Sequence, residues 1–168
     1  MEMIYKAIKF AERKHEGQVR KKSGAPYITH LIMTSYILTR FKRSSHFEEL
    51  VCAALLHDTL EDTDTNFIEV AKEFTPLVAS LVLELTSDDG EIERLGKNEY
   101  FKKKLPGLSN YGLLLKLCDR LANVMDNPKP QYILDTIELM ESLSYMRVLT
   151  GSQLNLIEEI KKECKKKS

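Results

Sequence analysis

The stretch AALLHDTLEDTDT, residues 53–65, decides the fold and holds the first candidate site. Its apolar start predicts a buried helix, and His57 and Asp58 follow directly. A charged side chain that enters such a low-dielectric region must be paired or bind a cation. Glu61 and Asp62 come one helical turn later, where the i,i+4 relation places Glu61 beside His57 and Asp62 beside Asp58. The segment predicts either a cluster of four functional groups or a solvated helix end with a satisfied histidine.

A second segment, LLLKLCDRLANV at residues 113–124, places Asp119 within another strongly apolar helix. A carboxylate in apolar surroundings is costly unless it meets a positive charge. Arg120 could supply that charge as a structural salt bridge. A metal ion shared with His57 and Asp58 could supply it as well. Both interpretations of Asp119 stay open at this level.

The spacing of apolar residues is helical almost throughout, and no segment shows a convincing strand alternation. We predict an all-α protein with about nine or ten helices around one core. His30 falls on the second helix, where a lone histidine is more often a core residue than a ligand. His15 and His46 lie near helix boundaries and are expected to be surface or capping residues. The predicted helices cover about residues 2–15, 27–41, 46–60, 65–74, 76–86, 90–104, 109–125, 131–148 and 152–165.

Three helix starts carry capping signals. Ser44 and Ser45 resemble an N-cap for the third helix, with Glu48 as a capping-box partner three residues after Ser45. Thr63 or Asp64 is expected to cap the fourth helix. Thr75 followed by proline predicts the start of the fifth. SDDG, residues 87–90, predicts a turn.

Length and composition are those of a folded globular protein. The 168 residues are 43% hydrophobic and 30% charged, which fits a single domain over residues 1–168. No apolar run approaches ~18 residues and the N-terminus has no signal-peptide pattern, so we expect neither a transmembrane helix nor a secretory signal. Basic and acidic residues balance at 25 each, which favours neither nucleic acid nor membrane as a partner. Three widely spaced cysteines indicate reduced thiols in a cytoplasmic protein, and Cys52 and Cys118 are expected to be small core residues.

Four segments together resemble a known family. They are HEGQVRKKSGAPYITH (15–30), AALLHDTLEDTDT (53–65), FTPLVASLVLELT (74–86) and LLKLCDRLAN (114–123). In sequence and in order they are similar to the hallmark blocks of the RelA/SpoT-type alarmone hydrolases, a branch of the HD-domain phosphohydrolases, in its small single-domain form. The resemblance implies a compact helical bundle around one manganese ion. It also implies hydrolysis of the 3′-pyrophosphate of ppGpp or pppGpp, which leaves GDP or GTP and pyrophosphate.

The resemblance also implies roles for individual residues. The metal ligands would be His30, His57, Asp58 and Asp119, the catalytic pair Glu61 and Asp62, and the substrate-binding residues Arg20, Lys21 and Asn123. One extra residue, Lys22, leaves the register of this basic run open by one. Two departures from the family pattern are Leu31, where proline is usual, and Ala122, where many members have histidine or tyrosine.

The chemistry of these residue types agrees with such a role. Two histidines and two carboxylates leave coordination positions open and suit manganese, although zinc or iron would also fit. The metal site does not select the base, so another nucleotide substrate, such as NADPH or an adenine alarmone, is an alternative. A non-catalytic, antitoxin-like binding module is a second alternative. Without the resemblance, the run at residues 20–22 could equally be a solvated basic loop. No protein partner is indicated.

Overall fold

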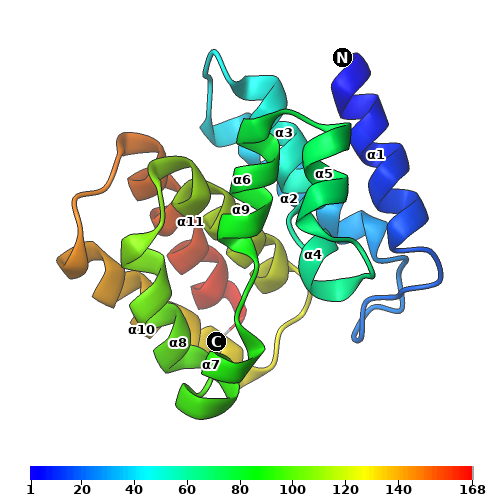
Figure 1. Ribbon diagram of the computed structural model, residues 1–168. Helices are drawn as coiled ribbons and strands as arrows, with labels where there is room; N and C mark the ends of the chain where they lie inside the picture. The colour runs from blue at the N-terminus through cyan, green and yellow to red at the C-terminus, as the bar shows by residue number, and fades with distance from the viewer. Residues whose placement is uncertain (168) are drawn as a thin grey trace. The chain divides into compact units, whose positions relative to one another are not determined.

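The fold is all-α, as predicted. The computed structural model describes residues 1–167, and within them it contains eleven α-helices, one 3₁₀ turn and no strand (Figure 1). The helices form two compact units, Met1–Thr86 and a second that begins at Ser87. The single-domain organisation expected from chain length stays a prediction. No helix in the described chain is long and apolar enough to cross a bilayer.

The first unit is built around α3 (Phe47–Leu56). This helix contacts α1, α2 and α6 (Figure 1), and every residue from Leu50 to Leu56 is buried. A helix that is apolar on all sides is stable only when it is enclosed. His57 and Asp58 follow α3 directly, so the central helix of the unit positions them. The other helices are α1 (Glu2–Lys14), α2 (Ile28–Phe41), α4 (Thr59–Asp62), α5 (Phe67–Glu73) and α6 (Pro76–Leu85).

The second unit is built around α9 (Asn110–Met125), which contacts α10 and α11. The Ser109 hydroxyl accepts a hydrogen bond from the backbone N–H of Gly112 at 3.0 Å and caps the helix. Most of α9 is buried, including Asp119. The other elements are α7 (Asp89–Leu95), α8 (Lys97–Lys104), the 3₁₀ turn η1 (Leu105–Gly107), α10 (Pro130–Met146) and α11 (Gly151–Lys167).

The described helices outnumber the nine predicted ones because two predicted helices are split. The first divides into α3 and α4 at the HD pair, residues 57–58, and the second divides into α7 and α8 at Gly96, which has φ +82°. The Thr75 cap is confirmed, since its hydroxyl accepts the N–H of Val78. The other two predicted caps are wrong. His46 occupies the N-cap position of α3, where its side chain makes no capping hydrogen bond, and Asn66 caps α5 by accepting the N–H of Glu69.

Candidate functional site

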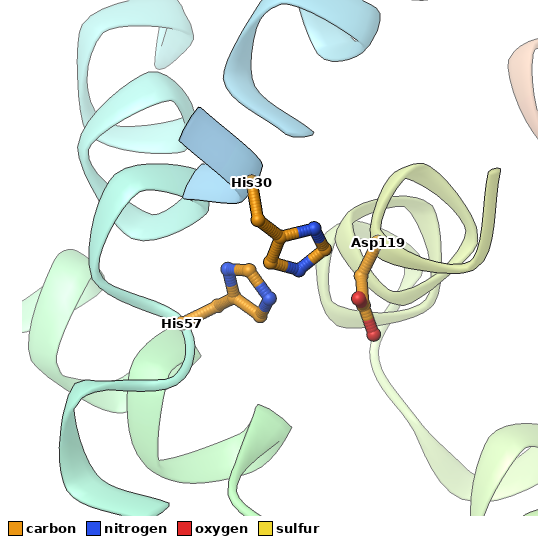
Figure 2. A group of neighbouring side chains, drawn as sticks. All are labelled: His30, His57 and Asp119. Carbon is orange, nitrogen blue, oxygen red and sulfur yellow. The ribbon is translucent and has the colours of Figure 1, made fainter. Parts of the chain in front are cut away.

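Three potential metal ligands of the first unit approach one another. His30 lies in the first turn of α2, and His57 and Asp58 lie at the end of α3. Oδ2 of Asp58 is 3.1 Å from Nε2 of His57 and 3.6 Å from Nε2 of His30. The two imidazole rings are buried, with centroids 5.3 Å apart and planes at 61° (Figure 2). Two ring nitrogens therefore face one carboxylate oxygen.

The hydrogen bond of His57 determines which of its nitrogens can bind a metal. Nδ1 lies 2.8 Å from the carbonyl oxygen of Ala54. A carbonyl only accepts, so Nδ1 carries the proton and, in the neutral ring, Nε2 presents a lone pair. That lone pair faces Oδ2 of Asp58, and the two atoms repel unless a proton or a cation lies between them. A histidine that donates one N–H to a carbonyl and offers the other nitrogen is the usual form of a metal ligand. The donor set of the first unit thus fits a divalent cation.

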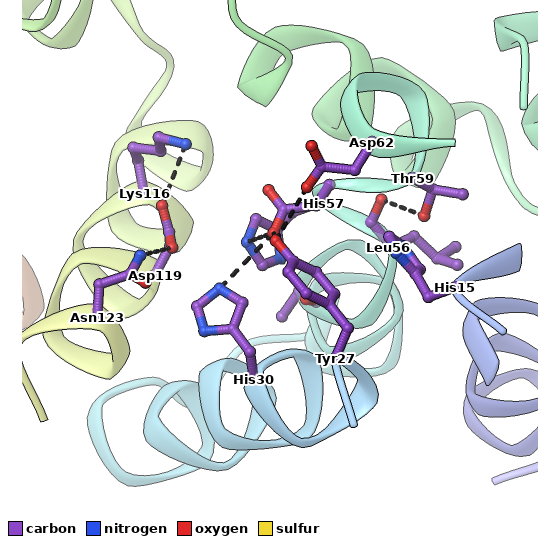
Figure 3. A network of polar contacts seen from close by, with 12 residues as sticks. His15, Tyr27, His30, Leu56, His57, Thr59, Asp62, Lys116, Asp119 and Asn123 are labelled. Carbon is purple, nitrogen blue, oxygen red and sulfur yellow. Dashed lines mark hydrogen bonds and ion pairs between the residues drawn. The ribbon is translucent and has the colours of Figure 1, made fainter. Parts of the chain in front are cut away.

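Tyr27, which the sequence analysis did not assign to the site, joins Asp58 to Asp62. Its hydroxyl lies 2.7 Å from Oδ2 of Asp58 and 2.9 Å from Oδ2 of Asp62 (Figure 3). Burial, and then the charges of the two carboxylates, raise the pKa of Tyr27 far above that of an ordinary phenol, so the hydroxyl stays a donor. Asp58 and Asp62 lie side by side, as the i,i+4 relation predicts. The other predicted acid, Glu61, lies exposed on α4.

His15 is the C-cap residue of α1, as expected, but its side chain does not lie on the surface. Only 3% of it is exposed, because its ring stacks on the ring of Tyr27 at a centroid distance of 5.0 Å and an angle of 14°. Its Nδ1 lies 2.8 Å from Oε1 of Gln18, an acceptor, so Nδ1 is the donor. The amide nitrogen of Gln18 in turn donates to the backbone oxygen of Asp62 at 2.7 Å. The loop after α1 thus contacts both Tyr27 and α4.

The three basic residues at 20–22 occupy different environments. The guanidinium carbon of Arg20 lies 5.7 Å from the centre of the Tyr27 ring, and its backbone N–H donates to Ala25 at 2.8 Å. Lys21 and Lys22 are exposed in the turn that Gly24, at φ +69°, helps to close. Arg20 is therefore the member of the run that packs against Tyr27.

In the second unit, Asp119 meets a positive charge from its own helix. Nζ of Lys116 lies 3.1 Å from one carboxylate oxygen, and Nδ2 of Asn123 donates to the other at 2.6 Å (Figure 3). Lys116 is itself buried, and the sequence analysis did not single it out. Its position one turn before Asp119 is the signal that could have found it. Asn123, predicted to lie near the base and ribose, uses its amide on Asp119.

Arg120 does not neutralise Asp119. Its guanidinium lies between two aromatic rings, 5.3 Å from the centre of Phe101 and 5.0 Å from that of Tyr132. It also donates to the Thr136 hydroxyl at 3.3 Å. These are cation–π contacts of a structural kind, so the salt bridge considered for Arg120 is replaced by the one from Lys116.

Comparison with known proteins places this chain in a family. The family described as HD domain matches residues 7–106, which is more than half of the sequence. The chain belongs to the HD-domain family. Human guanosine-3′,5′-bis(diphosphate) 3′-pyrophosphohydrolase MESH1 is 41% identical over 124 residues, covering 73% of this chain and 68% of the human protein. An Aquifex aeolicus protein named guanosine-3′,5′-bis(diphosphate) 3′-pyrophosphohydrolase is 38% identical over 125 residues, covering 73% of this chain and 17% of its own length.

Two solved structures are similar to this chain. The structure of a metazoan SpoT orthologue, described as hydrolysing ppGpp, matches with a TM-score of 0.81 at 29% identity and covers 97% of this chain and 96% of its own. A Listeria monocytogenes protein matches with a TM-score of 0.66 at 21% identity, covering 86% of this chain and 97% of its own, and shows the fold alone. The resemblance of this HD-domain chain to the RelA/SpoT-type proteins is thereby confirmed.

Proposed function

We propose that this protein hydrolyses the 3′-pyrophosphate of ppGpp or pppGpp and releases pyrophosphate with GDP or GTP. The relatives named for this reaction support the substrate class. The observation that carries a metal-dependent mechanism is the approach of His57 and His30 to a single oxygen of Asp58. We assign the fourth ligand to Asp119, the remaining member of the H…HD…D order.

Manganese is the proposed ion. Imidazole and carboxylate ligands with open coordination positions suit it, and zinc or iron are the alternatives. A bound ion of this kind lowers the pKa of a coordinated water and polarises the phosphoryl group that is attacked. The Nδ1–H of His57 donates to the backbone oxygen of Ala54, which leaves Nε2 as the nitrogen that would bind the ion.

Glu61 and Asp62 are the proposed acid–base pair. Both belong to α4, one turn after the metal ligands His57 and Asp58. Their carboxylates would orient the attacking water, accept its proton and return a proton to the 3′-oxygen as its bond to phosphorus breaks. Tyr27 donates to Asp62 and so fixes its orientation.

Arg20 and Lys21 are the proposed contacts to the pyrophosphate, since both carry charge that can neutralise it. Arg20 packs on the Tyr27 ring, whose hydroxyl contacts Asp58 and Asp62. Asn123 is the proposed contact near the base and ribose. A cytoplasmic location belongs to the same proposal, and it is supported by three buried cysteines that form no disulfide.

One product assay tests the function. Purified protein, stripped with a chelator and reloaded with Mn²⁺, is incubated separately with ppGpp, pppGpp, NADPH and simple nucleotides, and the products are identified by anion-exchange chromatography. We expect GDP and pyrophosphate from ppGpp in equal amounts, and no product from the chelated protein. Faster hydrolysis of NADPH or of an adenine nucleotide would transfer the proposal to that substrate. Absence of turnover on every substrate would favour a binding module.

A further inference from the structure

The Tyr27 hydroxyl has one proton and two carboxylate neighbours. It lies 2.7 Å from Asp58, a proposed metal ligand, and 2.9 Å from Asp62, a proposed catalytic acid. Hydrogen bonds to an ionised carboxylate are shorter and stronger than neutral ones. A single phenol thus provides a direct connection between the ligand that would hold the ion and the acid that would act on its water.

The hydroxyl also counters a repulsion. Asp58 and Asp62 contact the same atom, and two carboxylates at such a distance repel each other unless a donor or a cation lies between them. Without the hydroxyl, either carboxylate could rotate away. Partners that orient a ligating carboxylate affect metal affinity almost as strongly as the ligands themselves.

The ring of Tyr27 is held on one face. The imidazole of His15 stacks on it at an angle of 14°, and Gln18 fixes that imidazole through Nδ1. The same Gln18 donates to the backbone oxygen of Asp62. The aromatic stack and the acid are therefore connected by two routes, one through the Tyr27 hydroxyl and one through Gln18.

We propose that Tyr27 is a positioning residue, which orients Asp58 to bind the metal and Asp62 to act on water, and that His15 holds Tyr27 in place. The inference rests on the proposed metal site and adds two residues to it. It concerns orientation, so the phenol itself makes no bond to the ion or the nucleotide.

Tyr27→Phe is the direct test, because it removes one oxygen and keeps the ring on His15. Tyr36→Phe is the matched control, since Tyr36 also lies on α2 and 56% of it is exposed. Mn²⁺ binding to chelator-stripped protein is measured by calorimetry without nucleotide, and kcat and KM are measured at saturating Mn²⁺. We expect Tyr27→Phe to weaken Mn²⁺ binding by about 10–100-fold. It should also lower kcat more than it raises KM, whereas Tyr36→Phe should match the wild type.

His15→Ala tests the stack. With Tyr27 present, loss of the stacked ring should weaken Mn²⁺ binding in the same direction as Tyr27→Phe. In the Tyr27→Phe background it should add little, because residues that act through one another have non-additive effects. If His15→Ala weakened Mn²⁺ binding by the same factor in both backgrounds, His15 would act independently of Tyr27 and would be removed from the proposal. Circular dichroism and thermal midpoints identify any variant that has lost its fold.

The outcomes separate this inference from the proposed function. A wild type that binds Mn²⁺ but leaves ppGpp intact would refute the function, while the Mn²⁺ titrations of the two tyrosine variants would still decide the role of Tyr27. Tyr27→Phe with wild-type Mn²⁺ affinity and wild-type kcat would overturn the inference, even if its thermal midpoint fell. If Tyr27→Phe bound Mn²⁺ more weakly but kept the wild-type kcat, Tyr27 would orient Asp58 but not Asp62. A wild type that takes up no Mn²⁺ would overturn the metal site and the inference together.

Discussion

At the scale of single residues, His57 is the proposed metal ligand whose ring orientation is most directly set, by a hydrogen bond to a backbone carbonyl. The Nδ1–H bond to the backbone oxygen of Ala54 directs Nε2 at Asp58, so His57→Ala removes a proposed ligand that the main chain orients. We expect loss of bound Mn²⁺ and of hydrolysis, with a near-normal far-UV circular dichroism spectrum. Metal analysis after dialysis checks this, and His46→Ala, at an exposed histidine, is the control. Retention of stoichiometric Mn²⁺ in His57→Ala would refute the assignment.

The acidic pair separates catalysis from metal binding. Glu61→Gln and Asp62→Asn keep size and remove charge from two exposed groups of α4. General acid–base groups contribute about 10²–10⁴-fold, so each variant should lose that much kcat and keep its ion. Asp64→Asn serves as the control, because Asp64 pairs with Lys14 and not with the site. A double variant with the wild-type rate would contradict the mechanism.

The sequence singled out candidate residues that carry a charge close after an apolar run, and it did not single out residues whose contacts depend on the three-dimensional fold. His57, Asp58 and Asp62 are evident from the HD and ED pairs, and the i,i+4 relation predicts that Asp58 and Asp62 lie on the same side, where both contact the Tyr27 hydroxyl. The stack of His15 on Tyr27 joins two ends of one loop, and a tyrosine before a helix is too common to indicate it. Lys116 looked like an ordinary helix lysine because its burial depends on packing.

At the scale of elements, Gly96 separates α7 from α8. Its φ of +82° and ψ of 148° lie in a region that essentially only glycine occupies. Gly96→Ala should therefore reduce the free energy of unfolding by about 1–3 kcal/mol, although space for a methyl group is open. Urea unfolding measures the change. Gly107→Ala is the control, since its space is also open and its φ is not positive. Equal stability of the two variants would show that the strain at residue 96 is relieved by local rearrangement.

Helix positions were predictable and helix interruptions were not. Apolar spacing continues across both breaks, at residues 57–58 and at Gly96, so periodicity alone reads each pair of helices as one. The break at 57–58 separates α3 from α4 at the point where Asp58 lies close to both His57 and His30. The capping signals failed where several serine, threonine or aspartate residues precede one helix. Asn66 was overlooked because Thr63 and Asp64 offer the same chemistry two or three residues earlier.

At the scale of the whole molecule, the division into two units was not visible in the sequence. It falls at Ser87, the first residue of the segment 87–90 that was predicted as a turn and of which Asp89 and Gly90 instead begin α7. No glycine- or serine-rich linker marks the division. Which helices contact one another depends on tertiary packing, and one sequence carries no record of such contacts. The net charge, by contrast, follows directly from the sequence. The protein has a net charge of zero, so its net charge does not attract a nucleotide that carries four or more negative charges.

Local cations must supply that attraction, and the run at 20–22 is the candidate. Changing all three residues to glutamate should raise KM for ppGpp well over tenfold and leave the Mn²⁺ content unchanged. The matched control changes three exposed lysines at the end of α11, residues 165–167, to glutamate. It alters the net charge by the same amount at a position far along the chain from residues 20–22. Steady-state kinetics and metal analysis on both triple variants check the expectation. Equal KM values for the wild type and for the glutamate variant at residues 20–22 would show that this basic run does not bind the nucleotide.

Ionic strength tests the same charges without substitution. The Debye length falls from about 10 Å at 0.1 M salt to about 3 Å at 1 M, so contacts from exposed side chains weaken. Lys21 and Lys22 are exposed, and a bis-pyrophosphate carries more charge than a singly phosphorylated nucleotide. Hydrolysis of ppGpp should therefore fall more steeply with salt than hydrolysis of the monophosphorylated compound, and the glutamate variant should lose this difference. If the wild type showed the same salt dependence on both compounds, the run at 20–22 would not bind the nucleotide. The lysines of α8, residues 102–104, would then be the next candidates, although Lys102 already pairs with Glu138.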